Sequence, residues 1–133
     1  YEPLQNMTLE YLHKYGRLLS FTGTIYDYDT DGRADTSASV SIPSHIFRIL
    51  MACQKWRGNS SCESPSDASV IAFIMPHIER EFNCLDKEDL LLTYSARVRD
   101  IELMTGIQFF ADRRIVDSES ARVLRTHVTE RLW

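Results

Sequence analysis

The sequence predicts a single α+β domain over residues 1–133. The chain has 133 residues, of which 44% are hydrophobic and 26% charged, and this balance supplies one core for a chain of that size. Two kinds of hydrophobic period alternate along it, namely the spacing of amphipathic helices and the alternation or short apolar runs of strands. Few strands follow from this pattern, so we expect a chain segment outside these residues to complete the sheet.

The N-terminal part is predicted to form one helix and several strands. Leucine and tyrosine side chains at helical spacing predict a helix over Thr8–Tyr15, which Gly16 ends. Alternation of apolar and polar residues predicts a strand over Leu18–Tyr26. The short apolar runs Ile46–Ala52 and Val70–Met75 are predicted to be buried strands.

The C-terminal part is predicted to be helical. Apolar side chains recur at helical spacing over residues 90–105 and predict the longest helix of the chain. Asp86 is the expected N-cap of this helix, and Gly106 is the expected residue after its last turn. A last short helix is expected over Ser118–Arg125, where serine side chains can cap its start.

Charged and histidine side chains give no catalytic pattern. Arg97 and Asp100 are three residues apart, and so are Arg99 and Glu102. This is the spacing of neighbours on a helix surface, so we interpret both pairs as solvent-exposed charges. No two of the histidines His13, His45, His77 and His127 stand at a metal-ligand spacing. There is also no G-x-S-x-G motif, so we expect no catalytic residue in this chain.

The overall composition excludes several functional classes. The net charge is −4, from 15 Lys+Arg against 19 Asp+Glu, so we expect no direct binding of nucleic acid or of a membrane surface. No apolar run approaches the ~20 residues that a membrane-spanning helix needs. The chain begins at Tyr1, without Met or a signal peptide, so either processing removed what came before or the chain is a piece of a larger protein. We expect a piece, because of the cysteines described next.

The cysteines and two glycosylation patterns indicate the compartment. Asn6 and Asn59 each begin an N-x-Ser/Thr acceptor pattern. Cys53 and Cys62 flank a segment of Gly, Asn and Ser, which suits a disulfide that closes a surface loop and adds ~2.5–3 kcal/mol by chain entropy. Three buried cytosolic thiols are the alternative. We interpret the chain as extracellular, which leaves Cys84 with a partner outside the chain or as a free thiol.

The acidic segment 27–35 is the most informative part of the sequence. It has the oxygen-bearing residues of the first nine positions of an EF-hand calcium loop, with Gly32 at the sharp turn. The expected calcium ligands are the carboxylates of Asp27, Asp29, Asp31 and Asp35 and the backbone carbonyl of Arg33. Ala38 replaces the usual closing glutamate, so the site is EF-hand-like without being a helix-loop-helix hand. The alternative is a solvated acidic turn.

The chain resembles one protein family from about Thr8 to Thr126. Five segments within this range carry the resemblance, and they occur in the same order as in the family. They are Ser20–Asp35, Ile42–Phe47 followed by Cys53, Phe73–His77, Asn83–Cys84 and Ala96–Phe110. The first reads SFTGTIYDYDTDGRAD where the family has SGPIFDYDYDGxxD, and the last reads ARVRDIELMTGIQFF where the family has ARVRDIELLTGLDFY. Together they resemble the nuclease-like domain at the C-terminus of the ectonucleotide pyrophosphatase/phosphodiesterases, the family of venom phosphodiesterase and autotaxin.

This resemblance implies that the chain is the second half of a DNA/RNA non-specific endonuclease-like domain, a mixed sheet with flanking helices. In the family that domain is inactive and serves as a scaffold for the catalytic domain. The resemblance also implies calcium at the acidic segment 27–35 and a local Cys53–Cys62 disulfide. It further implies that Cys84 is bonded to the catalytic domain, the remainder of the same protein.

For the whole protein, the resemblance implies hydrolysis of phosphodiester or pyrophosphate bonds in nucleotides, or of lysophospholipids in some members. Zinc ions, a threonine nucleophile and the nucleotide substrate would be held in a separate catalytic domain outside this chain. Two alternatives remain open. One is the C-terminal half of a secreted DNA/RNA non-specific endonuclease, whose histidine base would lie upstream, and the other is a free-standing calcium-binding module.

Overall fold

The structure is a computed structural model of the chain. It describes residues 2–26, 44–57, 61–62, 68–76, 91–110 and 118–129. The elements in chain order are α1 (Glu2–Tyr15), β1 (Leu19–Ile25), β2 (His45–Cys53), β3 (Trp56–Arg57), β4 (Ser61–Cys62), β5 (Ala68–Pro76), β6 (Ser95–Ala96), α3 (Val98–Thr105) and α4 (Ser118–Thr126). The predicted α+β class is confirmed.

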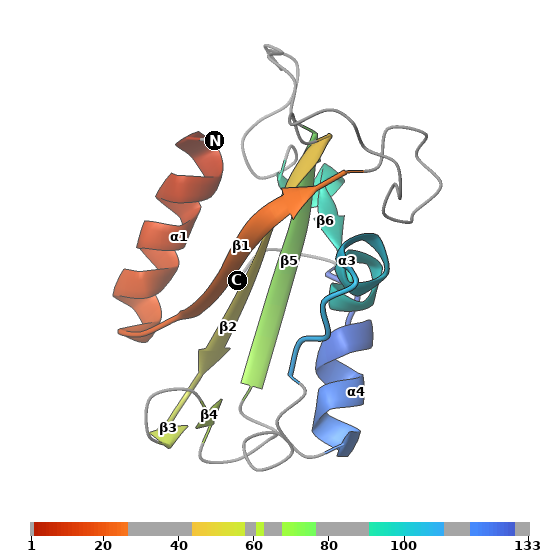
Figure 1. Cartoon of the computed structure of the whole chain (residues 1–133). Coiled ribbons are helices and arrows are strands. Elements are labelled where there is room, and N and C mark those ends of the chain that lie inside the picture. The colour runs from red at the N-terminus through yellow and green to blue at the C-terminus, as the bar shows by residue number, and fades with distance from the viewer. Residues whose placement is uncertain are drawn as a thin grey trace.

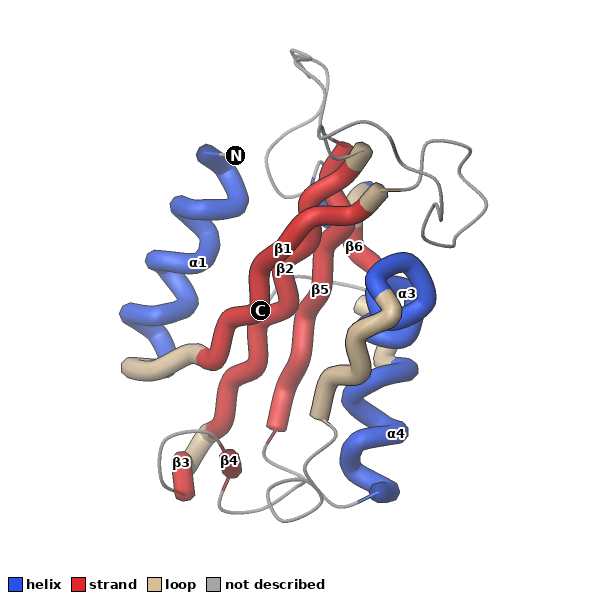
Figure 2. Tube along the Cα trace, in the orientation of Figure 1, coloured by secondary structure: helices blue, strands red, loops and turns tan. Residues whose placement is uncertain are grey.

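A four-stranded sheet in the order β1-β2-β5-β6 forms the centre of the described structure. Helix α1 covers one face of this sheet, and α3 and α4 lie against the other (Figure 1, Figure 2). All three strand pairings in it are antiparallel, so the mixed sheet that we expected is wrong for the described strands. The short strands β3 and β4 form a separate antiparallel pair directly after β2.

The core has two parts, one on each face of the sheet. On the α1 face, the helix residues Met7 and Tyr11 pack with Leu50, Ile71, Phe73 and Met75 of the central strands. On the opposite face, Val98, Ile101, Phe109 and Leu124 pack with Phe47, Ile49, Met51 and Val70. Because β2 and β5 are covered on both sides, their sequences are almost continuously apolar, which is why both strands could be predicted.

Several predicted elements are confirmed with small changes at their ends. The helix α1 begins at Glu2, earlier than predicted, and ends before Gly16, whose φ of 74° only glycine adopts readily. The Gly16 amide donates to the carbonyl of Leu12 at 2.8 Å, which closes the last turn. The strands β1, β2 and β5 and the helix α4 lie where the apolar pattern predicts them.

The long helix predicted up to Gly106 is wrong in its middle. Tyr94 lies in a turn, and β6 then pairs with β5 through Ala72 opposite Ala96 and Phe73 opposite Ser95. The β6 residues Ser95 and Ala96 form hydrogen bonds with backbone groups of β5 that would otherwise be buried without partners. This contact with a distant strand outweighs the local helical spacing of the sequence. Helix α3 therefore begins only at Val98. Its predicted end is confirmed, because Gly106 has a φ of 73° and donates to the Glu102 carbonyl at 2.9 Å.

Gly23 in β1 lies directly beneath an aromatic ring of the core. A Cβ at this position would come within 2.7 Å of Phe47 Cε1 and 2.8 Å of Phe47 Cζ. Phe47 has little room to move, because it is 5% exposed and its ring packs edge-on against Phe109 with a centroid distance of 5.9 Å. The strand therefore needs glycine here so that the Phe47 ring can lie over this position of β1.

Replacing Gly23 with alanine is accordingly expected to lower the free energy of unfolding by about 1–3 kcal/mol, the usual cost of overpacking a core. Thr24→Ala, an exposed neighbour in the same strand, is the control and should cost less. In a Phe47→Leu background, Gly23→Ala should cost less than it does in the native chain, since the ring is gone. Chemical denaturation measures all three. Equal costs for Gly23→Ala and Thr24→Ala would contradict the proposed clash.

Candidate functional site

The connection between β1 and β2, which contains the predicted calcium segment, is anchored to the sheet at both of its ends. Ile25, the last residue of β1, pairs with His45, the first residue of β2. The Ser44 amide and hydroxyl both donate to the Ile25 carbonyl, at 2.8 and 3.0 Å, and His45 Nδ1 lies 2.8 Å from Ser44 Oγ. Ile25 is itself 1% exposed in the core. The chain therefore leaves the sheet and returns to it at fixed neighbouring points, and the acidic segment begins two residues after the first of them.

The predicted ligands themselves lie outside the described residues. They are Asp27, Asp29, Asp31, Arg33 and Asp35, so the EF-hand-like arrangement stays a prediction. Within the part of the chain that the structure describes, no group of three or more His, Cys, Asp and Glu side chains could hold a metal ion. Across the same residues, no helix has the length and apolar character needed to cross a membrane.

The predicted cysteine and glycosylation residues are only partly described. Cys53 is 2% exposed at the end of β2, and its sulfur takes part in a disulfide bond. The backbone of Cys62 lies in β4, opposite Trp56 of β3, so the chain turns back soon after Cys53. Asn6 is exposed on α1. Cys84 and Asn59 lie outside the described residues, and the pairing of the cysteines stays a prediction.

The predicted exposed pair at the start of α3 is confirmed. The side chains of Arg97 and Asp100 are 46% and 37% exposed, and Arg97 Nη2 lies 2.9 Å from Asp100 Oδ1. Asp100 also accepts from the backbone amide of Arg97 at 3.1 Å, which satisfies a free donor at the start of the helix. The hydrogen bond to Asp100 raises the pKa of Arg97.

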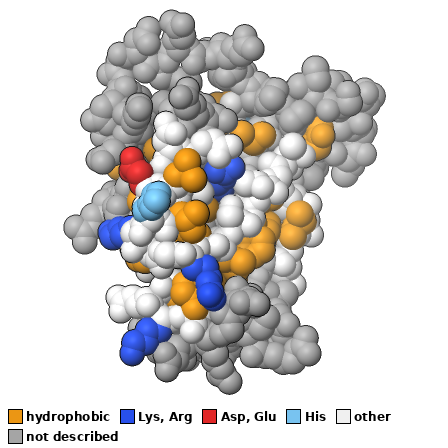
Figure 3. Space-filling model, turned by 90° about the vertical axis from the view of Figure 1, so that its left-hand side faces the viewer, with side chains coloured by type: hydrophobic (Ala, Val, Ile, Leu, Met, Phe, Trp, Pro, Cys, Tyr) orange, Lys and Arg blue, Asp and Glu red, His pale blue; other side chains and the backbone are white. Residues whose placement is uncertain are grey.

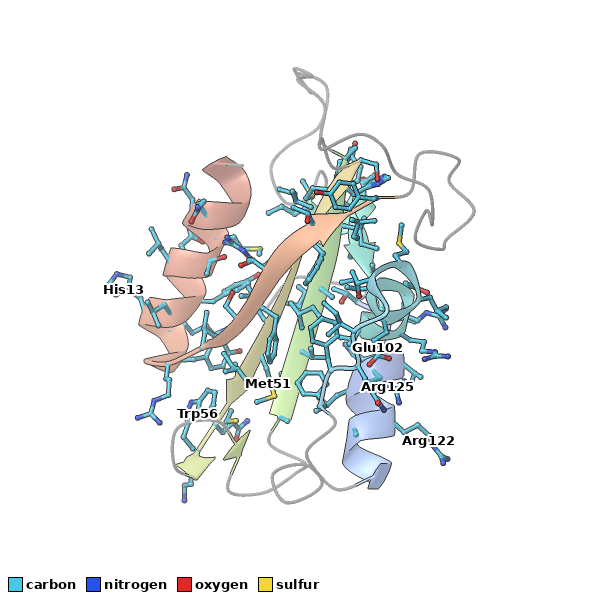
Figure 4. All side chains as sticks on the ribbon, viewed as in Figure 1. His13, Met51, Trp56, Glu102, Arg122 and Arg125 are labelled. Atoms are coloured by element: carbon cyan, nitrogen blue, oxygen red, sulfur yellow. The ribbon has the colours of Figure 1, made fainter. Side chains whose placement is uncertain are left out.

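The second pair is not a solvent-exposed pair, because Glu102 is buried. Its side chain is 3% exposed, and Oε1 accepts from Arg125 Nε at 2.7 Å and Nη2 at 2.6 Å. The other oxygen, Oε2, accepts from the Phe109 amide at 2.8 Å. Arg99, the predicted partner, is more distant, with Nη1 at 3.7 Å from Oε1. Figure 4 shows Glu102 and Arg125 turned toward each other, with Arg122 pointing away.

This buried pair joins three parts of the C-terminal region. Glu102 lies in α3, Phe109 follows that helix, and Arg125 lies in α4. Both carboxylate oxygens are occupied by hydrogen bonds, so we assign Glu102 a structural role. Sequence reasoning missed it because Glu102 and Arg125 are separated by 23 residues, and no local spacing signals such a contact.

No protein-family model matches the chain, but individual proteins do. It is 31% identical over 136 residues to an ectonucleotide pyrophosphatase/phosphodiesterase of Caenorhabditis elegans, covering 99% of this chain and 16% of the relative. It is 33% identical over 143 residues to ectonucleotide pyrophosphatase/phosphodiesterase family member 1 of Mus musculus, covering 89% of this chain and 15% of the relative. It is 31% identical over 119 residues to the venom phosphodiesterase of Naja atra, covering 77% of this chain and 14% of the relative. The chain thus spans about one sixth of the first of these relatives.

Proposed function

The chain belongs to the ectonucleotide pyrophosphatase/phosphodiesterase family, and from this membership we propose that it is a calcium-binding, catalytically inactive portion of an extracellular nucleotide pyrophosphatase/phosphodiesterase. The observation that carries the proposal is the extent of the similarity, which covers 99% of this chain and only 16% of a relative. A segment that forms so small a part of a hydrolase can serve it as a scaffold. The catalytic zinc ions and the nucleophile belong to a separate domain outside these residues.

Calcium binding is proposed for the acidic segment 27–35. A hard cation takes six to eight oxygen ligands at about 2.3–2.6 Å, and alternate carboxylates in a tight turn supply several of them. The contacts of Ser44 with Ile25 support this proposal, because a connection whose two ends are already held together loses less entropy when part of it closes around an ion. The ion would in turn hold the connection between β1 and β2, which are neighbours in the central sheet.

An extracellular location accords with the names of the relatives, which include venom enzymes and ectoenzymes. In that setting the chain would be the second half of a nuclease-like domain that packs on the catalytic domain. The whole protein would hydrolyse phosphodiester or pyrophosphate bonds of nucleotides, as the relatives' names state for them.

The isolated chain is therefore expected to hydrolyse neither a nitrophenyl nucleotide ester nor DNA when zinc and magnesium are supplied. The whole protein should hydrolyse the ester under the same conditions and is the positive control. His45 contacts Ser44 at the base of the acidic segment, so His45→Ala should not alter any rate. Turnover by the isolated chain that disappears in His45→Ala or His77→Ala would overturn the scaffold role. Cleavage of DNA by the whole protein, with none by the isolated chain, would favour the endonuclease alternative.

Cys84 is expected to form a disulfide with a cysteine outside these 133 residues, while Cys53 pairs with Cys62. Cys53 is in a disulfide, and the chain turns back from β3 to Cys62 in β4. A Cys53–Cys62 bond would therefore close only a short loop. Peptide mapping of the whole protein without reduction decides the matter. A free Cys84 thiol, or a Cys53–Cys84 bond, would remove the proposed link to the catalytic domain.

A further inference from the structure

The acceptor pattern at Asn6 lies inside a packed helix, where its residues point in different directions. Asn6 is exposed, whereas Met7 is 6% exposed in the core beneath α1. The Thr8 hydroxyl accepts a hydrogen bond from Arg48 Nη1 of β2 at 3.1 Å. The hydroxyl that an acceptor pattern requires is therefore engaged in the folded chain, while the asparagine is directed to solvent.

The same solvent face of α1 carries two exposed leucines. Leu9 is 55% exposed and Leu12 is 43% exposed, and we call these two residues the α1 ridge. Leu9 is one helical turn after Asn6, and helical side chains lean toward the N-terminus, so Leu9 leans toward Asn6. Figure 3 shows hydrophobic side chains on this side of the molecule, and Figure 4 shows His13, two turns after Asn6, pointing away from the sheet.

We propose that Asn6 carries an N-linked glycan whose first sugars lie over the α1 ridge. The proposal rests on the extracellular location proposed above. Sugar rings present C–H groups on their faces, and these can cover Leu9 and Leu12 while the hydroxyl groups stay in water. The glycan thus has an attachment point one turn from the apolar surface that it would shield.

Attachment of this glycan exchanges one bond at C1 of the first sugar for another. A bond forms between the side-chain amide nitrogen of Asn6 and C1 of the first sugar. The bond between C1 and oxygen in a lipid-pyrophosphate-linked oligosaccharide breaks, and the lipid pyrophosphate leaves while the amide loses a proton. Because Thr8 is bound to a residue 40 positions away in the folded chain, this transfer must precede the packing of α1 on the sheet.

The test uses the whole protein secreted from a glycosylating cell line. Glycopeptide mass spectrometry should find Asn6 occupied. Asn6→Gln removes the glycan and keeps the contact of Thr8 with Arg48, and it should lower the melting temperature. When the glycan is trimmed enzymatically to its first sugar, most of the melting-temperature difference from Asn6→Gln should remain, since that sugar would lie closest to Leu9.

A double-mutant cycle locates the contact. In a Leu9→Ser, Leu12→Ser background, the melting-temperature difference between the glycosylated protein and its Asn6→Gln variant should shrink. Val123→Ser is the matched control, because Val123 is 62% exposed on α4 and should leave that difference unchanged. If the melting-temperature difference is unchanged in the Leu9→Ser, Leu12→Ser background, the glycan does not cover the α1 ridge. A loss of stability from Leu9→Ser that is equal with and without the glycan would show that protein, and not sugar, covers the α1 ridge.

The glycan proposal and the proposed function fail in different ways. If the Asn59 peptide is glycosylated and the Asn6 peptide is not, the protein has passed through a glycosylating compartment and only the glycan on α1 is refuted. If neither peptide is glycosylated, the glycan on α1 is refuted, whereas the extracellular location is tested separately by whether the whole protein is secreted at all.

Discussion

Replacing Arg125 with alanine is expected to lower the free energy of unfolding by about 3 kcal/mol, the usual cost of leaving a buried charge without its partner. The Glu102 side chain is 3% exposed in the native chain, and without Arg125 it would keep only the Phe109 amide at 2.8 Å and Arg99 at 3.7 Å. Neither contact replaces the bonds at 2.6 and 2.7 Å that Arg125 supplies. The loss in free energy of unfolding, measured by chemical denaturation, should therefore be much larger than the loss caused by an ordinary surface substitution.

Arg122→Ala is the matched control. Arg122 lies in the same helix, is exposed and points away from Glu102. Its replacement should therefore change the free energy of unfolding by no more than about 0.5 kcal/mol. A second variant that replaces Glu102 and Arg125 together with leucine should recover much of the loss, because it leaves no buried charge. If Arg125→Ala costs no more than Arg122→Ala, the buried pair does not join α3 to α4 as we describe.

The parts of the fold that follow from local sequence could be predicted, and the parts that depend on distant partners could not. The continuous apolar runs of β2 and β5 and the glycines after α1 and α3 are local signals, and each was confirmed. The strand β6 was missed because its pairing with β5 joins Ala96 to Ala72, and its residues also fit a helical period. The strands β3 and β4 consist of two residues each, too few for alternation to be visible.

In the candidate site, too, the local pattern could be predicted from the sequence and the contacts between distant residues could not. The calcium pattern is a run of alternating oxygen ligands, so it can be predicted from consecutive residues, although its ligands lie outside the described residues. The anchoring of that segment by Ser44 and Ile25 is a contact between residues 19 positions apart, and only the fold reveals it. The burial of Glu102 likewise follows from packing. Its sequence spacing to Arg99 predicted an ion pair that the structure has at 3.7 Å, but no local spacing predicted the closer partner Arg125.

Calcium is expected to stabilise the whole protein through the segment 27–35. Its four carboxylates repel one another when the site is empty, so removal of the ion should loosen the connection between β1 and β2. At ~1 mM calcium, a site with a dissociation constant of ~10⁻⁴ M adds about 1.4 kcal/mol, and a site of ~10⁻⁶ M adds about 4 kcal/mol. The fixed ends at Ile25 and His45 favour the larger value. Magnesium should substitute poorly, since it requires octahedral geometry at shorter distances.

Calcium binding by the segment 27–35 is tested by the melting temperature of the whole protein in calcium and in a calcium-selective chelator. The measurement is repeated for Asp29→Ala and for Asp100→Ala, an acidic residue in α3 that serves as the control. We expect chelation to lower the melting temperature of the native protein and of Asp100→Ala, while Asp29→Ala melts at the lower temperature in both conditions. A native protein that is insensitive to chelation, or an Asp29→Ala variant that keeps the full calcium response, would show that the segment is a solvated acidic turn.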